Sequence, residues 1–595
     1  MSLIAFPGFL AKAATMTVTQ VPPAGTSPQN AAGDDASART QAIGRWSWLP
    51  PVHWLANYQR AWLPSDVVAG VTLAAYAIPV SLAYAALAGL PPQVGIYGYL
   101  LGGLGYALLG SSRQLAVGPT SAISLMIAAT VSAMAEGDAQ RYAQIASLTA
   151  FTVAGLCLLA WLFRASALVT LISDSILTGF KIGAGLTIAM TQLPKLFGVE
   201  GGGHNFFERV YLLLGQLGDM QLLVLAVGLI AIALLLLGER ALPGRPIALG
   251  VVALAIVLAT VLGLPSLGVP VTGKIPDGLP AFNGPSLRLR DVEGIVPLAV
   301  GCLLLAYIEG VSAARTFAAK HGYELDPRQE FLGLGAANLL TAFGQGYPVA
   351  GGLSQSAVND KAGAKTPLAL VVASVALALC LLFLTGFLEN LPKAVLAAVV
   401  LIAILGLFDF RGLVRMWRVS RIDFYAAAIA IAGVLLLGIL QGILLAALAS
   451  ILLLLARASR PHVAFLGRVP GTNSYSDLDR HPDNEPLQGL IAFRPEASLL
   501  YVNAGSVFET VMAKLQPDAR IRAVVCDLSA SPHLDLAGAR MLNALNDQLA
   551  ARGISLQIVG ARGRVRDLLR ADGLAAKIGG LERTLSLNNV ISGHS

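Results

Sequence analysis

The sequence predicts a polytopic α-helical membrane protein that carries a small soluble α/β domain near its C-terminal end. Of its 595 residues, 55% are hydrophobic and only 13% are charged, and the mean hydropathy is +0.69. A soluble domain of this size does not need so much apolar surface. Apolar runs long enough to cross a bilayer recur between residues 66 and 457, and alternating strand-like and helix-like segments follow them.

Composition argues against several other classes of protein. The net charge of +7 is modest and spread over loops, which favours anchoring at a membrane face over nucleic-acid binding. The cysteines have no metal-type spacing, so we expect neither a disulfide framework nor a metal site: Cys157, Cys302, Cys380 and Cys526. Residues 268–274 resemble a phosphate-binding loop, but Ile275 replaces the required Ser or Thr. We therefore expect no enzymatic activity and no cofactor.

Three regions follow from the distribution of apolar residues. Residues 1–64 are rich in Ala, Pro, Thr, Ser and Gln and are expected to form a disordered cytoplasmic N-terminus. Residues 65–458 should form the transmembrane domain, and residues 461–595 a cytoplasmic α/β domain. In that domain we expect strands near 499–503, 523–528 and 554–559 and helices near 537–552 and 565–571.

About fourteen apolar segments make up the transmembrane domain. They lie near 66–89, 93–110, 118–134, 141–163, 166–193, 219–238, 245–263, 292–317, 330–345, 351–366, 367–388, 393–410, 421–438 and 440–457. The third and the tenth are short and polar at the tip, and they hold the same place in two halves of seven. Because seven is odd, the halves must lie inverted in the bilayer. Basic residues gather in the loops of one side, which predicts that both termini are cytoplasmic in a multi-pass protein of a bacterial-type inner membrane.

The third and tenth segments begin in a way that suits an anion site. Pro119, Thr120 and Ser121 open the third, and Ser354 and Ser356, which we expect to cap a helix, follow the glycines that open the tenth. A helix N-terminus inside the membrane carries roughly half a positive charge. Discontinuous helices of this kind mark the substrate sites of secondary transporters.

Glu309 is a carboxylic acid within an otherwise apolar segment. A charge at that depth costs roughly 2.5–3.5 kcal/mol on insertion scales, so we expect the side chain to be functional or protonated. No base stands three or four residues away, and Arg315 lies on another face of the helix. The alternative is an ion pair with a base of another helix, such as Lys181.

Several motifs together resemble the sulfate permease (SulP) anion transporters, which carry a C-terminal STAS domain. They are residues 78–92, 118–121 and 351–359 in the membrane part and 466–472 and 499–504 in the soluble part. The resemblance implies a seven-plus-seven fold shared with nucleobase transporters, in which helices 1–4 and 8–11 form a core and helices 5–7 and 12–14 a gate. It also implies a homodimer and elevator-like alternating access.

The resemblance further implies which residues bind the anion: Tyr76, Gly118, Thr120, Ser121, Gly352, Leu353, Ser354 and Gln355. Two positions depart from the family's pattern, because Val80 stands where many members have Gln, and Gln355 where many have Arg. Without that arginine, two helix N-termini leave a divalent anion under-compensated. Gln355 could also serve merely to cap its own helix. In the STAS-like segment, Ala537 occupies the position of a phosphorylatable residue, which argues against a phosphorylation switch there.

The function that these observations favour is secondary active transport of a small inorganic anion, most simply proton-coupled sulfate uptake, with Glu309 as the proton-coupling residue. Protons and the lipid bilayer are then the other partners. Bicarbonate or C4-dicarboxylate uptake is the alternative within the same class. A membrane-tethered STAS regulator is the alternative from another class, but such an anchor needs neither two polar half-helices nor an intramembrane carboxyl group.

Overall fold

The computed structural model describes residues 54, 58–165, 173–203, 205–242, 246–276, 278–286, 288–515, 521–583 and 585–592. Most of residues 1–64, for which we expected disorder, lie outside these ranges. A 3₁₀ turn, η1 (Arg60–Trp62), leads into the first long helix at Leu63.

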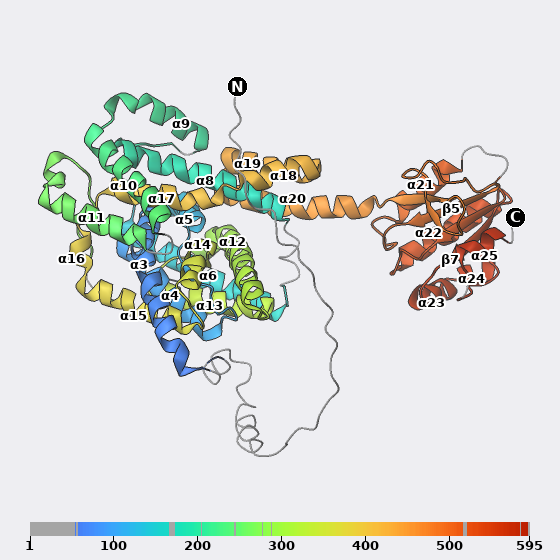
Figure 1. Ribbon diagram of the computed structural model, residues 1–595, viewed down its shortest axis with the longest axis horizontal. Coiled ribbons are helices and arrows are strands. Elements are labelled where there is room, and N and C mark those ends of the chain that lie inside the picture. The colour runs from blue at the N-terminus through green and yellow to red at the C-terminus, as the bar shows by residue number, and fades with distance from the viewer. Residues whose placement is uncertain are drawn as a thin grey trace, which may run out of the picture. The chain divides into compact units, whose positions relative to one another are not determined.

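Every apolar segment expected from the sequence contains a helix (Figure 1). These helices are α3 (Leu63–Leu87), α4 (Pro92–Leu109), α5 (Ser121–Ala135), α6 (Ala139–Leu162), α8 (Asp174–Phe197), α10 (Leu222–Ala241), α11 (Ile247–Val261), α12 (Leu289–His321), α13 (Pro327–Phe343), α14 (Leu353–Lys361), α15 (Leu368–Phe383), α17 (Lys393–Ile404), α19 (Arg421–Leu437) and α20 (Ile439–Ser459). Within the described residues, 7 helical stretches are long and apolar enough to cross a membrane by length and composition. The chain is therefore a helical, multi-pass membrane protein.

Several short elements were not expected from the sequence. They are α9 (Phe206–Gly215), α16 (Thr385–Leu388), α18 (Phe410–Val419), η2 (Leu217–Asp219), η3 (Leu264–Leu267) and η4 (Leu405–Leu407). Helix α18 places the exposed side chains of Phe410, Val414 and Trp417 along one face. A search for long apolar runs misses α9 and α18 because charged residues interrupt their apolar residues.

The membrane helices pack in two sets. In the first set, which comprises α3–α6 and α12–α15, α13 packs on α4 and α6, and α15 packs on α3 and α4. In the second set, which comprises α8, α10, α11, α17, α19 and α20, α19 packs on α8 and α20, and α10 packs on α17. Glycines allow close approach in both, since a Cβ on Gly105 would lie 2.5 Å from the Ala336 carbonyl oxygen and one on Gly179 would lie 2.1 Å from that of Ala427.

The C-terminal part is an α/β domain (Figure 1). It is built on a five-stranded sheet with the order β4-β3-β5-β6-β7. Its strands are β3 (Val463–Arg468), β4 (Tyr475–Asp477), β5 (Leu490–Pro495), β6 (Ala523–Asp527) and β7 (Ser555–Val559). Strand β3 pairs antiparallel with β4 and β5, while β5, β6 and β7 run parallel. The helices are α21 (Ala504–Lys514), α22 (Leu536–Ala550), α23 (Gly563–Ala571), α24 (Leu574–Lys577) and α25 (Leu587–Ser592).

The expectation of a strand at residues 499–503 was wrong. Leu499 makes a single bridge to Leu534, and the residues after it form a turn that enters α21. The Asn503 side chain accepts a hydrogen bond from the Leu500 amide and donates one to the Ser498 carbonyl. These local bonds replace the ladder that a strand would need.

Candidate functional site

Two short strands bring the polar tips of α5 and α14 together. Strand β1 (Val117–Gly118) pairs antiparallel with β2 (Ala350–Gly351), so that Val117 faces Gly351 and Gly118 faces Ala350. Helix α5 begins 3 residues after Gly118 and α14 begins 2 residues after Gly351. A Cβ on Gly118 would lie 2.3 Å from the Tyr99 ring, so this position requires glycine. The two helix N-termini therefore emerge from one strand pair.

The Gln355 side chain stabilises that strand pair through hydrogen bonds. Its Nε2 donates to the carbonyl oxygens of Ala116 at 2.8 Å and Ala350 at 3.1 Å, and its Oε1 accepts a hydrogen bond from the Tyr99 hydroxyl. Both amide hydrogens are thus used, and the residue is 4% exposed. Gln355 holds the backbone of two segments and does not cap its own helix.

Neither half-helix is capped by a side chain. Thr120 is the N-cap of α5 and Gly352 the N-cap of α14, and neither end has a side-chain capping bond. The expectation that Ser354 and Ser356 cap α14 was wrong, because both lie inside the helix. The first-turn amides of both helices therefore meet no capping oxygen, which leaves their partial positive charge for a ligand.

A cavity of about 130 Å³ opens in front of these two helix ends. The first helix set contributes Tyr76, Tyr84, Pro119, Thr120, Ser121, Ala122, Glu309, Ser312, Ala313, Gly352, Leu353, Ser354 and Gln355. The second set and the turn after α17 contribute Phe180, Lys181, Ala184, Ala403, Gly406 and Leu407. Such a volume accommodates a small ion with a few waters.

The cavity gathers nearly all of the residues that the sequence singled out. Gly118 is the exception: it does not line the cavity but supports it from the strand pair. The Thr120 hydroxyl oxygen is buried and has no hydrogen-bond partner among the described residues. A buried hydroxyl without a partner at a cavity wall is the kind of group that a bound polar ligand would satisfy.

One acid and one base line this cavity. Of the described residues that line the cavity, Glu309 is the only acid and Lys181 the only base. No ion pair within 4.0 Å among the described residues includes either of them. The ion pair that we considered for Glu309 is therefore not formed, and both side chains remain available to a ligand or a proton.

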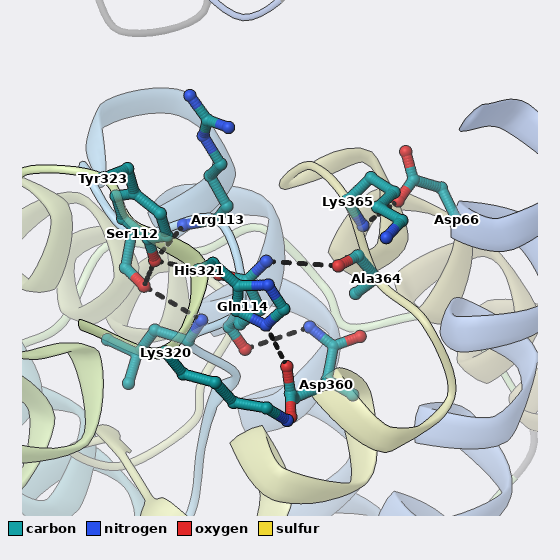
Figure 2. Close-up of polar contacts among 12 residues, drawn as sticks. Asp66, Ser112, Arg113, Gln114, Lys320, His321, Tyr323, Asp360, Ala364 and Lys365 are labelled. Carbon is teal, nitrogen blue, oxygen red and sulfur yellow. Dashed lines mark hydrogen bonds and ion pairs between the residues drawn. The ribbon is translucent and has the colours of Figure 1, made fainter. Parts of the chain in front are cut away.

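The opposite end of α14 is held by a network of polar side chains (Figure 2). The Asp360 carboxylate accepts a hydrogen bond from Lys320 Nζ at 2.5 Å and lies 2.5 Å from His321 Nε2, both at the end of α12. Asp66, in the first turn of α3, accepts hydrogen bonds from the backbone amides of Lys365 at 2.7 Å and Thr366 at 3.1 Å. These contacts fix α14 at its far end, so its N-terminus has a defined position.

The segment before β1 joins the same network. The Tyr323 hydroxyl lies 3.1 Å from the Ser112 hydroxyl and donates to Gln114 Oε1 at 2.9 Å, and Gln114 Nε2 donates to the Ala364 carbonyl at 3.2 Å (Figure 2). Sequence reasoning missed these residues because the three bonds that join them to the network span more than 200 residues, and no local sequence pattern indicates such bonds.

Comparison with known proteins identifies the family. A model of the sulfate permease family matches residues 63–431, and a model of the STAS domain matches residues 481–588. A probable sulfate transporter of Mycobacterium tuberculosis is 34% identical over 533 residues, which cover 89% of this chain and 95% of that one. The chloroplastic sulfate transporter 4.1 of Arabidopsis thaliana is 30% identical over 89% of this chain and 80% of its own.

Solved structures share the fold. The murine solute carrier 26 family member A9 anion transporter in the inward-facing state superposes with a TM-score of 0.84 at 21% identity, and the match covers 96% of each chain. The transmembrane domain of a cyanobacterium bicarbonate transporter superposes with a TM-score of 0.56 at 20% identity over 66% of this chain and 97% of that one. The chain thus belongs to the sulfate permease family of anion transporters, with a C-terminal STAS domain.

Proposed function

We propose that the protein is a secondary active transporter that takes up sulfate together with a proton. The observation that carries this proposal is the cavity in front of the uncapped N-termini of α5 and α14, which faces one carboxyl group, Glu309. The helix ends suit an anion, and a carboxyl group that must lose or keep a proton inside a membrane suits a coupling role. The relatives named sulfate transporters support sulfate as the anion.

The residues have distinct roles in this proposal. First-turn backbone amides at Ser121 and Leu353 and the hydroxyls of Thr120 and Ser354 contact the anion, because these groups meet at the cavity wall. Tyr76 and Gly352 shape the same wall. Gly118 and Gln355 act indirectly, since they hold the strand pair from which both helices start.

Glu309 controls the charge of the cavity. The two helix ends together supply about one positive charge. Ionised Glu309 would cancel about one positive charge of the cavity, whereas the protonated form leaves that charge available to the anion. An anion and a proton therefore bind more favourably together than separately, which is the condition for symport.

The transport cycle follows from the two helix sets. We propose fourteen membrane segments in two inverted halves of seven, within residues 65–458, and both termini in the cytoplasm of a cell with a bacterial-type inner membrane. The first set carries the half-helices and Glu309, and the second set closes the cavity from the other side. An elevator-like displacement of the first set against the second would expose the cavity to each side in turn. A homodimer would hold the second set in place, and residues 461–595 form the cytoplasmic STAS domain.

Bicarbonate is the second candidate substrate. No side chain of α14 adds a positive charge to the cavity, because Gln355 is neutral and already bonded to backbone groups. A monovalent anion matches the two helix ends without further help. The structural likeness to a cyanobacterium bicarbonate transporter keeps this candidate open.

Uptake into proteoliposomes tests the proposal. The purified full-length protein is reconstituted, and labelled sulfate, bicarbonate and succinate are offered with and without an inward proton gradient. Sulfate accumulation that depends on the gradient is the expected result. Accumulation of bicarbonate or succinate in its place would replace the proposed substrate, and no uptake of any anion would favour a membrane anchor for a regulatory domain.

A further inference from the structure

Lys181 is a lysine inside a membrane helix, and its side chain has no partner among the residues that the structure describes. It lies on α8, in the second helix set, and lines the cavity between Phe180 and Ala184. No hydrogen bond or ion pair of its side chain is found among the described residues, and the Glu309 carboxyl group lines the same cavity. Charged groups at membrane depth that face a cavity without a protein partner mark pathways for ions and substrates.

The charges around the cavity show what such a lysine would do. The ends of α5 and α14 contribute about one positive charge together. Gln355 contributes none, and its amide hydrogens are already donated to Ala116 and Ala350. When Glu309 is protonated, a monovalent anion is balanced by the helix ends alone, whereas a divalent anion needs one more positive charge. Of the described residues that line the cavity, Lys181 is the base that can supply it.

We propose that Lys181 is the residue that selects divalent oxyanions, by placing a full positive charge opposite the two half-helix N-termini. This inference rests on the proposed function, since it assigns a role within the same anion site. It also explains how the chain can be a sulfate transporter although Gln355 stands where many family members have arginine: the second charge comes from α8 across the cavity.

The position of Lys181 has a consequence for the transport cycle. The half-helices and Glu309 belong to the first helix set, and Lys181 belongs to the second. A divalent anion would therefore be held by both sets at once. Charge selection would act in the conformation in which the two sets face each other across the ion.

Binding of two ions of the same shape and different charge tests the proposal. Sulfate and perchlorate are both tetrahedral, but sulfate is divalent and perchlorate monovalent. Their affinities are measured by calorimetry on the purified full-length parent protein and on Lys181→Met, which keeps the length of the side chain. We expect the ratio of sulfate affinity to perchlorate affinity to fall by about tenfold or more in Lys181→Met, because removing one charge weakens a divalent ion more than a monovalent one.

Three variants serve as controls. Lys181→Arg keeps the charge and should keep most of the parental ratio, while Lys195→Gln removes a lysine of the same helix that lies outside the cavity and should keep it fully. Lys181→Gln is the second neutral variant if the methionine variant does not elute as a single species on size exclusion. An arginine variant that loses the ratio as completely as the methionine variant would contradict a role based on charge.

The outcomes separate this inference from the proposed function. If the parent protein binds sulfate and Lys181→Met keeps the parental ratio, the role of Lys181 is refuted and sulfate transport stands. If the parent protein binds neither ion, the proposed function is overturned, and the assignment of Lys181 falls with it.

Discussion

The Ser356 hydroxyl accepts a hydrogen bond of 2.9 Å from the backbone amide of Ala116, 240 positions earlier in the chain. The same hydroxyl donates to the Gly352 carbonyl at 2.7 Å. A single side chain thus joins the arm that leads into α5 to the first turn of α14. The two helix N-termini are held against each other by this bond, by the β1–β2 pair and by Gln355.

Ser356→Ala should destabilise the protein because it leaves the buried Ala116 amide without a partner. The loss of such a bond costs about 1–3 kcal/mol. Thermal unfolding in detergent should show a lower midpoint for this variant. Ser312→Ala is the matched control, since Ser312 faces the cavity and its hydroxyl makes no hydrogen bond among the described residues. Equal midpoints for both variants would refute the structural role of Ser356.

Ser354→Leu should abolish transport while the protein stays folded. Ser354 is exposed to the cavity, so the leucine would occupy the space of the anion and add apolar bulk that the membrane tolerates. Uptake of labelled sulfate and size-exclusion chromatography measure the two effects. A transport-competent Ser354→Leu would place the anion elsewhere.

Gln355→Arg should raise the preference for divalent anions and lower the stability together. The guanidinium adds a positive charge near the helix ends, but the bonds to Ala116, Ala350 and Tyr99 are lost. The uptake ratio of sulfate to bicarbonate and the unfolding midpoint report the two effects. Gln355→Met loses the same bonds without adding charge, so a ratio that rises equally in both variants would rule out the electrostatic explanation.

The helical membrane part and the two half-helices could be predicted from the sequence because each has a recognisable local sequence pattern. Apolar runs reveal α3 or α20, and a proline or glycine beside hydroxyl residues reveals the starts of α5 and α14. The hydrogen bonds that hold the site together produce no such local pattern. The sequence does not show that Gln355 hydrogen-bonds to both strands of the pair, or that Asp66 accepts a hydrogen bond from Thr366, because these partners are distant in sequence.

Some helices and strands were missed because their local sequence patterns are short or misleading. Helix α18 is too short and too charged to be read as a span. Strands β3 and β5 were overlooked, and residues 499–503 were taken for a strand because they are mostly apolar, although local side-chain bonds of Asn503 turn the chain there. Lys181 was considered as an ion-pair partner of Glu309, and its place on the cavity wall emerged from the fold.

Asp477 links the STAS domain's stability to pH. Burial raises the pKa of its carboxyl group, but the hydrogen bond with the His462 ring at 2.7 Å and that from the Asp479 amide at 3.1 Å outweigh burial, so the pKa lies below its usual range. Because the folded-state pKa is lower than the unfolded value of about 3.9, the stabilisation is complete above that value. It is lost as the pH falls through the folded-state pKa.

Asp477→Asn should therefore loosen β3 and β4 at neutral pH but not in acid. The His462 side chain is 45% exposed, which weakens the bond through solvent screening, so we expect an effect of about 1 kcal/mol, or roughly fivefold faster amide exchange. Hydrogen exchange of the full-length protein, compared with the parent at matched pH, should show the difference at pH 7 and its decline below about pH 4. Asp479→Asn, at an exposed position, is the control. A difference that persists unchanged in acid would exclude the carboxylate as its source.

The central claim is that Glu309 binds the transported proton beside the anion in the same cavity. Glu309→Gln mimics the protonated carboxyl group permanently. The variant should still bind the anion and exchange it across the membrane, since the helix ends keep their charge. It should not respond to a proton gradient, since no carboxyl group remains among the described residues that line the cavity.

The most direct test is uptake of labelled sulfate by vesicles under an imposed inward proton gradient, measured for the parent protein and for Glu309→Gln at equal amounts of reconstituted protein. Counter-exchange of sulfate without a gradient shows that the variant is folded and binds the anion. Accumulation above the outside concentration in the parent, with exchange but no accumulation in the variant, is the predicted result. Gradient-driven accumulation by Glu309→Gln equal to that of the parent would contradict the coupling of anion and proton at this cavity.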